Sequence, residues 1–260
     1  MKKYIFVVFA VLGMAFYAAA QNEAYERKEY ATKSGEMLKY RMLSPKVLEK
    51  NKKYPLVLFF HGAGERGDDN ESQLRNGGSL FSNPSNRDQY PSFVLFPQCP
   101  TDTYWPTGIR PEQGFLDGNP FEKNFPISVP LSQVAELIDD FIANNPVDTN
   151  RIYVMGLSMG GMATFDFVCR FPNRFAAAVA ICGAVNEERL REFQGKTSFR
   201  IYHGDIDNVI PVSYSRNAYQ ALHDTGKKVT YTEFYGVNHG SWNPAFNDAT
   251  LMPWLYSQKK

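Results

Sequence analysis

The chain has little cysteine, and it has no excess of charge of either sign. Only three of its 260 residues are Cys, and 28 Lys and Arg against 27 Asp and Glu leave a formal net charge of +1. Binding to nucleic acid needs a clustered basic excess, so the charge balance argues against a nucleic-acid-binding protein. An intrinsically disordered chain is also excluded, because 43% of the residues are hydrophobic.

The three cysteines, Cys99, Cys169 and Cys182, form no metal-binding pattern. None of them has the spacing to other ligand residues that a structural zinc site requires. Their odd number leaves at least one thiol free unless it pairs between chains. We therefore expect three small buried side chains and no metal site.

The chain shows no internal repeat, low-complexity tract or linker, which predicts a single domain. At its start, the basic residues of Met1–Lys3 precede the apolar stretch Tyr4–Tyr17 and the small residues Ala18–Ala20. These are the parts of a secretory signal peptide over residues 1–20, so we expect cleavage after Ala20 and export to the periplasm or the cell exterior. An N-terminal membrane anchor is the alternative, but the stretch is short for a hydrocarbon core of about 30 Å. No stable membrane association is expected of the remaining domain, residues 21–260.

Short apolar runs alternate with amphipathic stretches, which predicts an α/β fold. Residues 25–32 and 36–43 alternate in polarity around a turn and predict an antiparallel hairpin. Further strands, several of them apolar throughout as in buried parallel strands, are predicted at Leu56–Phe60, Phe93–Phe96, Ile152–Met155, Ala176–Ile181, Phe199–Tyr202 and Val229–Phe234. Helical periodicity is found over Leu131–Asn144, Gly160–Phe171 and Ser213–Thr225. This alternation predicts a mostly parallel sheet with helices on both faces.

Residues 99–130 have no regular period and are rich in Pro and aromatic residues. A loop of about thirty residues is long for a compact domain, and such loops often form lids or walls of binding sites. The alternative is a surface loop that packs on its own aromatic residues. The loop can have both roles at once.

The segment 156–160, with the sequence GLSMG, directly follows a predicted strand and opens a predicted helix. A Gly-x-Ser-x-Gly nucleophile turn requires this context, because the tight connection leaves the Ser hydroxyl exposed. An ordinary tight turn is the alternative. We predict that Ser158 is a nucleophile and that the helix N-terminus behind it offers backbone N–H groups.

A serine alcohol needs a base, and the chain has four His residues. His239 lies in a loop after the last predicted strand, at the sheet edge where α/β folds place catalytic groups. His223 falls in a predicted amphipathic helix. His61 and His203 each end a strand in a His-Gly pair, where an imidazole more often braces the turn. We therefore predict that His239 is the base.

The imidazole in turn needs a carboxylate that fixes its tautomer, and the segment 203–211 offers two. Asp205 would lie at the turn itself, where carboxylates often cap backbone N–H groups. Asp207 lies further along the loop. The order Ser158, Asp207, His239 is the one expected for an α/β-hydrolase.

With these motifs the chain resembles the α/β-hydrolase superfamily over nearly all of residues 21–260. Within it, the chain is similar to secreted carboxylesterases of the feruloyl and acetyl-xylan esterase type, and to relatives described as phospholipase/carboxylesterase or predicted peptidase. The matching segments are 61–67 (HGAGERG), 96–100 (FPQCP), 156–160 (GLSMG), 203–207 (HGDID) and 239–242 (HGSW). The resemblance implies that Asp207, and not Asp205, is the acid of the triad.

Attack on an ester carbonyl creates an oxyanion, which preorganised N–H donors stabilise. One donor is expected at Met159, the residue after the nucleophile. The resemblance implies the second donor at Ala63, with Gly64 as a near rival. These small residues would let the backbone approach the substrate closely.

Three aromatic residues are candidates for substrate contact, because an aromatic face stacks on a sugar ring or a phenolic acyl group. Tyr104 and Trp105 lie in the irregular loop, and Trp242 follows the predicted base. A place in the core is the alternative for both Trp residues. The acidic run 65–71 lacks the ligand spacing of a calcium site, so a solvated loop with a local Glu–Arg pair is expected there.

Together these residues predict a secreted serine carboxylesterase that needs neither a metal nor an organic cofactor. Ser158 attacks an ester carbonyl, His239 moves the proton, Asp207 orients His239, and water releases the acyl group. The resemblance implies a feruloyl or acetyl ester on a plant polysaccharide, with a small ester or acylated oligosaccharide as the partner molecule. The alternatives are a serine peptidase of the same fold and a catalytically silent carbohydrate-binding protein.

Overall fold

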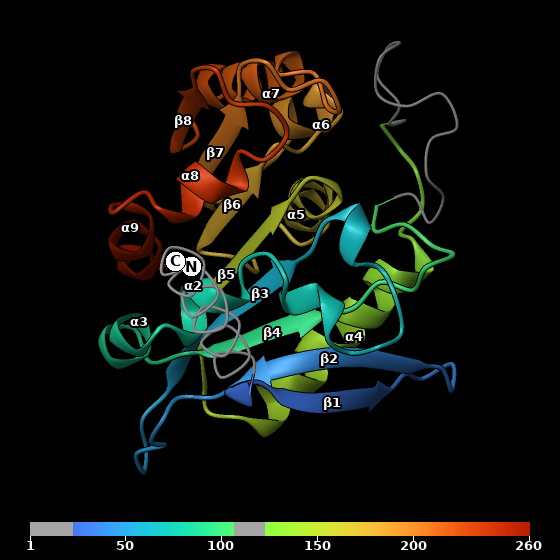
Figure 1. Cartoon of the computed structure of the whole chain (residues 1–260), viewed down its shortest axis with the longest axis vertical. Helices are drawn as coiled ribbons and strands as arrows, with labels where there is room; N and C mark the ends of the chain where they lie inside the picture. Colours follow the sequence, from blue (N-terminus) through green and yellow to red (C-terminus); the bar gives the residue numbers. More distant parts are fainter. Residues whose placement is uncertain (1–22, 107–122) are drawn as a thin grey trace, which may run out of the picture.

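The computed structural model describes residues 23–106 and 123–260, and the strands of this part of the chain form an eight-stranded sheet (Figure 1). Its order is β1-β2-β4-β3-β5-β6-β7-β8. The strands are β1 (Glu26–Ala31), β2 (Met37–Leu43), β3 (Tyr54–Phe60), β4 (Phe93–Pro97), β5 (Val147–Leu157), β6 (Ala177–Ile181), β7 (Ser198–Gly204) and β8 (Val229–Phe234). β2 pairs antiparallel with β1 and β4, and all other pairs are parallel. The predicted mostly parallel sheet with an N-terminal hairpin is confirmed.

The central strands are buried on both faces, as their continuous apolar runs predicted. Every residue of β3 is buried, and its side chains alternate between two hydrophobic clusters. Leu58 and Phe60 belong to one cluster, and Val57 and Phe59 belong to the other. Full burial of such side chains contributes roughly 1.5–3 kcal/mol each, so these strands form a rigid base for the loops at their ends.

Helices cover both faces of the sheet, as predicted. One cluster takes in buried residues of α4 (Val129–Asn144), α5 (Met159–Arg170), α6 (Glu187–Arg191) and α7 (Ser213–Asp224). The other takes in residues of α2 (Gly78–Ser82), α8 (Trp242–Phe246) and α9 (Leu251–Ser257). The short helix α3 (Pro84–Gln89) and two 3₁₀ turns, η1 (Ala63–Glu65) and η2 (Ser72–Leu74), complete these elements.

Some boundaries differ from the predicted ones for local reasons. α4 begins at Val129, because the Ser128 hydroxyl accepts a hydrogen bond from the N–H of Leu131 at 3.3 Å and Pro130 fits the first turn. β5 begins at Val147, which pairs with Tyr54 before a shift in register. The helices α2, α3, α6, α8 and α9 were not predicted, because five to seven residues are too few to show a helical period.

Within the described residues, none of the helices combines the length and the hydrophobicity needed to cross a bilayer. The predicted signal peptide, residues 1–20, lies outside the described residues. Residues 107–122 of the predicted long loop, 99–130, also lie outside the described residues.

Candidate active site

Ser158 lies at a strained turn between β5 and α5. Its φ of 53° and ψ of −119° lie in a region that residues other than glycine rarely adopt. A Cβ atom on Gly156 would lie 2.3 Å from the carbonyl oxygen of Gly160. The first glycine of the motif therefore leaves the space that the turn needs. The predicted nucleophile turn, residues 156–160, is present at the carboxyl end of β5 and is called the elbow below.

His239 joins Ser158 to Asp207 through its two ring nitrogens. Its Nε2 lies 2.9 Å from Ser158 Oγ, and its Nδ1 lies 2.8 Å from Asp207 Oδ2. Because an ionised carboxylate only accepts hydrogen bonds, Nδ1 carries the proton and Nε2 of the neutral ring can accept one from Ser158. The structure thus brings together the three residues predicted as nucleophile, acid and base, each placed after one of the parallel strands β5, β7 and β8.

The side chain of Asp207 has no exposed surface and accepts four hydrogen bonds. Its Oδ1 accepts from the N–H groups of Val209 and Ile210 at 2.8 and 2.9 Å, and its Oδ2 accepts from His203 Nε2 at 3.1 Å besides His239. Burial raises the pKa of this carboxyl, but the four hydrogen bonds outweigh burial and hold the pKa well below its usual range. Asp207 is therefore ionised at neutral pH.

Asp205 and His61, which were the alternatives for the acid and the base, brace turns, as their positions in the sequence suggested. Asp205 Oδ1 accepts a hydrogen bond from the N–H of Gly236 at 2.7 Å. His61 donates from Nδ1 to the carbonyl oxygen of Gly62 at 2.7 Å and accepts at Nε2 from the N–H of Cys99 at 3.0 Å. Burial lowers the pKa of His61 to about 4, so its ring is neutral at pH 7.

The two residues predicted as oxyanion donors each begin a helical segment. Met159 is the first residue of α5 and Ala63 is the first residue of η1. The N–H groups at a helix start have no partner within the helix. The loop of Ala63 packs against the elbow, since a Cβ atom on Gly62 would lie 2.8 Å from Leu157 Cδ1. The two N–H groups therefore belong to adjoining segments, and their role in binding an oxyanion stays a prediction.

Arg66 ties the loop of Ala63 to the segment that follows β4. Its Nε donates to the carbonyl oxygen of Ala63 at 3.0 Å, and its Nη1 donates to those of Thr101 and Thr103 at 3.1 and 3.0 Å. Its guanidinium carbon lies 5.8 Å from the ring centre of Tyr104. The sequence did not indicate this role of Arg66, because two of its carbonyl partners, those of Thr101 and Thr103, are distant in the chain.

Trp105 and Tyr104 lie in the core, which does not fit their predicted contact with substrate. Their exposed fractions are 0% and 3%. The indole N–H of Trp105 donates to the carbonyl oxygen of His61 at 3.2 Å, and its ring centre lies 5.1 Å from that of Phe60. The segment folds back onto the end of β3, so these aromatic side chains support the loop of Ala63.

Trp242 is half-buried at the start of α8 and contacts the predicted base. Its ring meets that of His239 edge-on, with the ring centres 5.5 Å apart and the planes at 88°. It also packs against the cluster that covers one face of the sheet. Of the three aromatic residues singled out, Trp242 remains the candidate for substrate contact.

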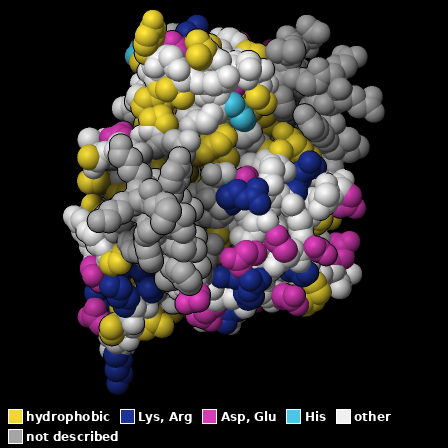
Figure 2. Space-filling model, viewed as in Figure 1, with side chains coloured by type: hydrophobic (Ala, Val, Ile, Leu, Met, Phe, Trp, Pro, Cys, Tyr) yellow, Lys and Arg dark blue, Asp and Glu magenta, His cyan; other side chains and the backbone are white. Residues whose placement is uncertain are grey.

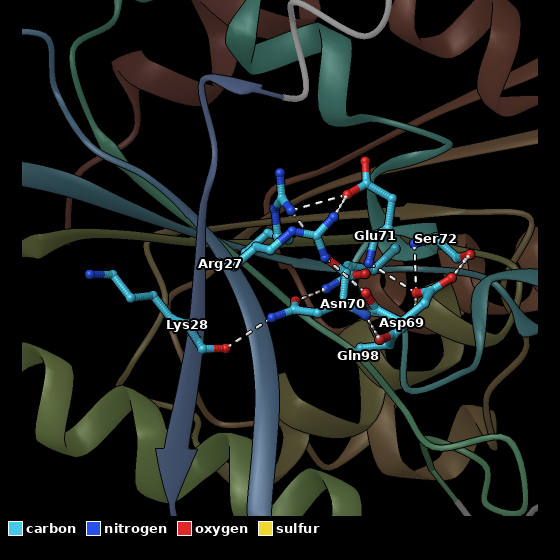
Figure 3. A network of polar contacts seen from close by, with 9 residues as sticks. Arg27, Lys28, Asp69, Asn70, Glu71, Ser72 and Gln98 are labelled. Carbon is cyan, nitrogen blue, oxygen red and sulfur yellow. Dashed lines mark hydrogen bonds and ion pairs between the residues drawn. The ribbon is translucent and has the colours of Figure 1, made fainter.

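The two glutamates of segment 65–71 have partners outside the segment, where the sequence predicted a local Glu–Arg pair. Glu71 pairs with Arg27 of β1 (Figure 3). It also pairs with Arg41 of β2, at 3.1 Å. Glu65 is buried and accepts a hydrogen bond from Asn76 at 2.9 Å, and burial raises its pKa. Acidic and basic side chains intermix over the lower part of the face in Figure 2, where β1 and β2 lie.

Asp69 is saturated by donors of the protein itself (Figure 3). It accepts hydrogen bonds from the N–H groups of Glu71 and Ser72, from the Ser72 hydroxyl and from the amide of Gln98. Burial raises the pKa of Asp69, but these hydrogen bonds outweigh it and lower the pKa below its usual range. The carboxylate thus organises the loop that leads away from Ala63.

Among the described residues, Cys182, Asp207 and His239 are the one group whose ligand atoms lie close enough to hold a metal, within 4.8 Å of one another. Two of them belong to the hydrogen-bonded triad. Burial raises the pKa of Cys182 to about 12, so its sulfur is a neutral thiol and a poor ligand. Cys99, Cys169 and Cys182 are all free.

Comparison with known proteins agrees with this geometry. A family model described as phospholipase/carboxylesterase matches residues 44–251. The crystal structure of a thermostable esterase is 35% identical with a TM-score of 0.81, and the match covers 93% of this chain and 64% of that chain. The carboxylesterase SOBER1 of Arabidopsis thaliana is 24% identical over 201 residues, which are 72% of this chain and 84% of the relative.

A bifunctional acetylxylan esterase/xylanase of Neocallimastix patriciarum is 32% identical over 77 residues, which are 30% of this chain and 11% of that enzyme. The chain thus spans less than two thirds of the thermostable esterase and about a tenth of the Neocallimastix enzyme. Ser158, Asp207 and His239 all lie within the residues that the family model matches. The chain belongs to the phospholipase/carboxylesterase family.

Proposed function

We propose that the protein is a serine carboxylesterase. The observation that carries this proposal is the chain of hydrogen bonds from Ser158 through His239 to the buried carboxylate of Asp207. The strained turn at Ser158 and the membership in the phospholipase/carboxylesterase family support it.

In the acylation step, Ser158 Oγ attacks the carbonyl carbon of the ester, and its proton passes to His239 Nε2. The carbonyl oxygen becomes an oxyanion, for which the N–H groups of Met159 and Ala63 are the proposed donors. The carboxylate of Asp207 stabilises the imidazolium that forms. His239 then gives the proton to the leaving alcohol oxygen, and the acyl group stays on Ser158 as an ester.

In the deacylation step, a water molecule takes the place of the alcohol. His239 Nε2 accepts a proton from the water, whose oxygen attacks the acyl carbon. When the tetrahedral intermediate collapses, the proton returns to Ser158 Oγ and the carboxylic acid leaves. Each cycle consumes one water and restores the free hydroxyl.

For the substrate, we propose an acetyl or feruloyl ester on a plant-type polysaccharide. The short match to the acetylxylan esterase of Neocallimastix patriciarum supports this class. A nearly neutral chain suits an uncharged substrate, and the half-buried Trp242 ring, which contacts His239, is the proposed contact for a sugar or phenolic group. We also propose export after cleavage behind Ala20, which N-terminal sequencing of the processed protein tests by finding Gln21 as the first residue.

Wild type and Ser158→Ala, assayed on p-nitrophenyl acetate, methyl ferulate, acetylated xylan and an aminoacyl amide, test the proposed function. Wild type should cleave the esters faster than the amide, and Ser158→Ala should lose at least about 10³-fold in kcat. Ser257→Ala removes an exposed hydroxyl in α9 and should behave as wild type. A fluorophosphonate probe should label wild type on Ser158 and leave Ser158→Ala unlabelled.

The same assays separate the alternatives. Ester cleavage that survives in Ser158→Ala would contradict the mechanism. Amide cleavage that outpaces ester cleavage would favour a serine peptidase. Inactivity on all four substrates together with binding to xylan would favour a carbohydrate-binding protein.

A further inference from the structure

His203 is buried directly behind the acid of the triad, and no step of the proposed mechanism uses it. Its side chain has no exposed surface, and its Nε2 lies 3.1 Å from Asp207 Oδ2 and 3.0 Å from the carbonyl oxygen of Ile210. Its Nδ1 lies 2.7 Å from the hydroxyl of Ser215, which is fully buried in α7. Partners at both nitrogens fix the orientation of the ring.

These partners also determine which nitrogen of His203 carries a proton. A carboxylate and a carbonyl oxygen only accept hydrogen bonds, so Nε2 must be the donor to Asp207 and Ile210. The hydroxyl of Ser215 can then donate to Nδ1 of the neutral ring. Asp207 and Ile210 thus select this tautomer, and the hydroxyl of Ser215, which can donate as well as accept, completes its hydrogen bonding at Nδ1.

The same carboxylate oxygen, Asp207 Oδ2, thus accepts hydrogen bonds from two imidazole rings. His203 donates at 3.1 Å from within the protein, and His239 donates at 2.8 Å from the side of Ser158. Rotation of the carboxylate about Cβ–Cγ would break the bond to His203. The donation from His203 also withdraws part of the negative charge that stabilises the imidazolium of His239.

We propose that His203, held by Ser215, is a positioning residue that orients Asp207 and limits the strength of its bond to His239. The proposal rests on the proposed function, because that function gives His239 its role as the base.

Other charged or titratable groups around His203 have partners of their own. Glu233 of β8 is opposite His203 in the strand register, but a two-point contact with Arg216 of α7 engages its carboxylate at 2.6 and 2.8 Å. On the side of β6, burial raises the pKa of the Cys182 thiol to about 12, so it is neutral. Among residues 23–106 and 123–260, Asp207 is therefore the one charged side chain that is hydrogen-bonded to His203.

The test compares wild type with His203→Phe, Ser215→Ala and Ser215→Thr in pH profiles of kcat and kcat/KM for p-nitrophenyl acetate. His203→Phe should lose about 10- to 100-fold in kcat, as when a partner that orients a functional group is removed, with KM changed less than about twofold. The acid limb of the kcat/KM profile should move to higher pH, because a carboxylate freed from one donor binds the imidazolium of His239 more strongly. Ser215→Ala should give a smaller effect in the same direction, and Ser215→Thr, which keeps the hydroxyl, should restore the profile.

Exposed His223 of α7 gives the control, since His223→Gln removes an imidazole far more exposed than that of His203 and should match wild type. An unchanged profile in folded Ser215→Ala and His203→Phe would overturn the inference. A lower kcat together with a lower Tm, but with the acid limb of the kcat/KM profile unchanged, would also overturn the inference. Lost packing alone would explain such a result. If His203→Phe fails to fold, Ser215→Ala, which removes a single oxygen, decides alone.

Ser158→Ala in the same series keeps the two proposals apart. Activity that persists in Ser158→Ala defeats the proposed function. Activity that depends on Ser158 but shows no shift in Ser215→Ala defeats the inference about His203 and leaves the esterase intact.

Discussion

A Cβ atom on Gly160 would lie 2.0 Å from the carbonyl oxygen of Phe60. The same atom would lie 2.8 Å from the carbonyl oxygen of His61. The first turn of α5 and the end of β3 are thus in direct backbone contact. This contact sets the nucleophile turn against the loop of Ala63, although the two segments are far apart in the sequence.

Gly160→Ala should therefore destabilise the protein strongly. The new methyl group would overlap backbone atoms, which cannot move aside as a flexible side chain can. We expect the free energy of unfolding in urea to fall by at least about 3 kcal/mol. Gly64→Ala is the matched control, because nothing lies within 4 Å of its Cβ position, and it should change the free energy by less than about 0.5 kcal/mol. Equal stabilities of the two variants would contradict the close contact.

Trp105 and Trp242 should respond differently to truncation. Trp105→Ala removes a fully buried indole, so the free energy of unfolding should fall by about 3–5 kcal/mol. Trp242→Ala removes the ring that meets His239, so kcat/KM should fall about tenfold, the cost of roughly one aromatic contact. Urea unfolding and ester hydrolysis measured on both variants test the assignment. If Trp105→Ala kept wild-type stability and had a raised KM, the result would indicate that Trp105 contacts substrate.

The parts of the site that follow directly on strands could be predicted from the sequence. The elbow at Ser158 needs small residues on both sides, and the sequence shows them between a strand and a helix. The carboxyl ends of parallel strands share one edge of the sheet, so His239 after β8 was placed correctly beside Ser158. Local chemistry and sheet topology are enough for such residues.

Features that depend on tertiary packing could not be predicted in this way. Trp105 looks the same in sequence whether its loop faces the substrate or folds back onto the core. Glu71 stands near Arg66 in the chain, yet its partners are Arg27 and Arg41 of the N-terminal hairpin. His203 was expected to brace a turn, and its contact with Asp207 became visible only when the loop after β7 was placed.

The three thiols should react slowly in the folded protein. Burial raises the pKa values of Cys99, Cys169 and Cys182 to about 12, and the thiolate is the reactive form. With Ellman's reagent at about pH 8, native protein should show little reaction, whereas protein unfolded in urea should show three reactive thiols. Rapid reaction of one native thiol would mean that its surroundings open readily.

Stability should depend on the neutral state of His61 between about pH 6.5 and 4. Burial lowers the pKa of His61 to about 4, from an ordinary value near 6.5. In this window the unfolded chain therefore binds a proton that the folded chain does not bind. Stability rises with pH wherever the unfolded state binds more protons, so acidification through this window should lower the free energy of unfolding by up to about 3 kcal/mol through His61.

The comparison of wild type with His61→Gln in urea unfolding at a series of pH values isolates this contribution. Burial raises the pKa of Glu65, which gives a slope of the opposite sign, and both proteins share it. The lowered pKa of Asp207 removes stability only below about pH 4, since a depressed carboxyl contributes fully above its unfolded pKa. His61→Gln should be less stable at pH 7, because it loses the bonds to Gly62 and Cys99, yet it should lose less stability on acidification. Parallel curves for the two proteins would show that His61 takes up its proton in the folded state, and exposed His223→Gln should keep the wild-type slope.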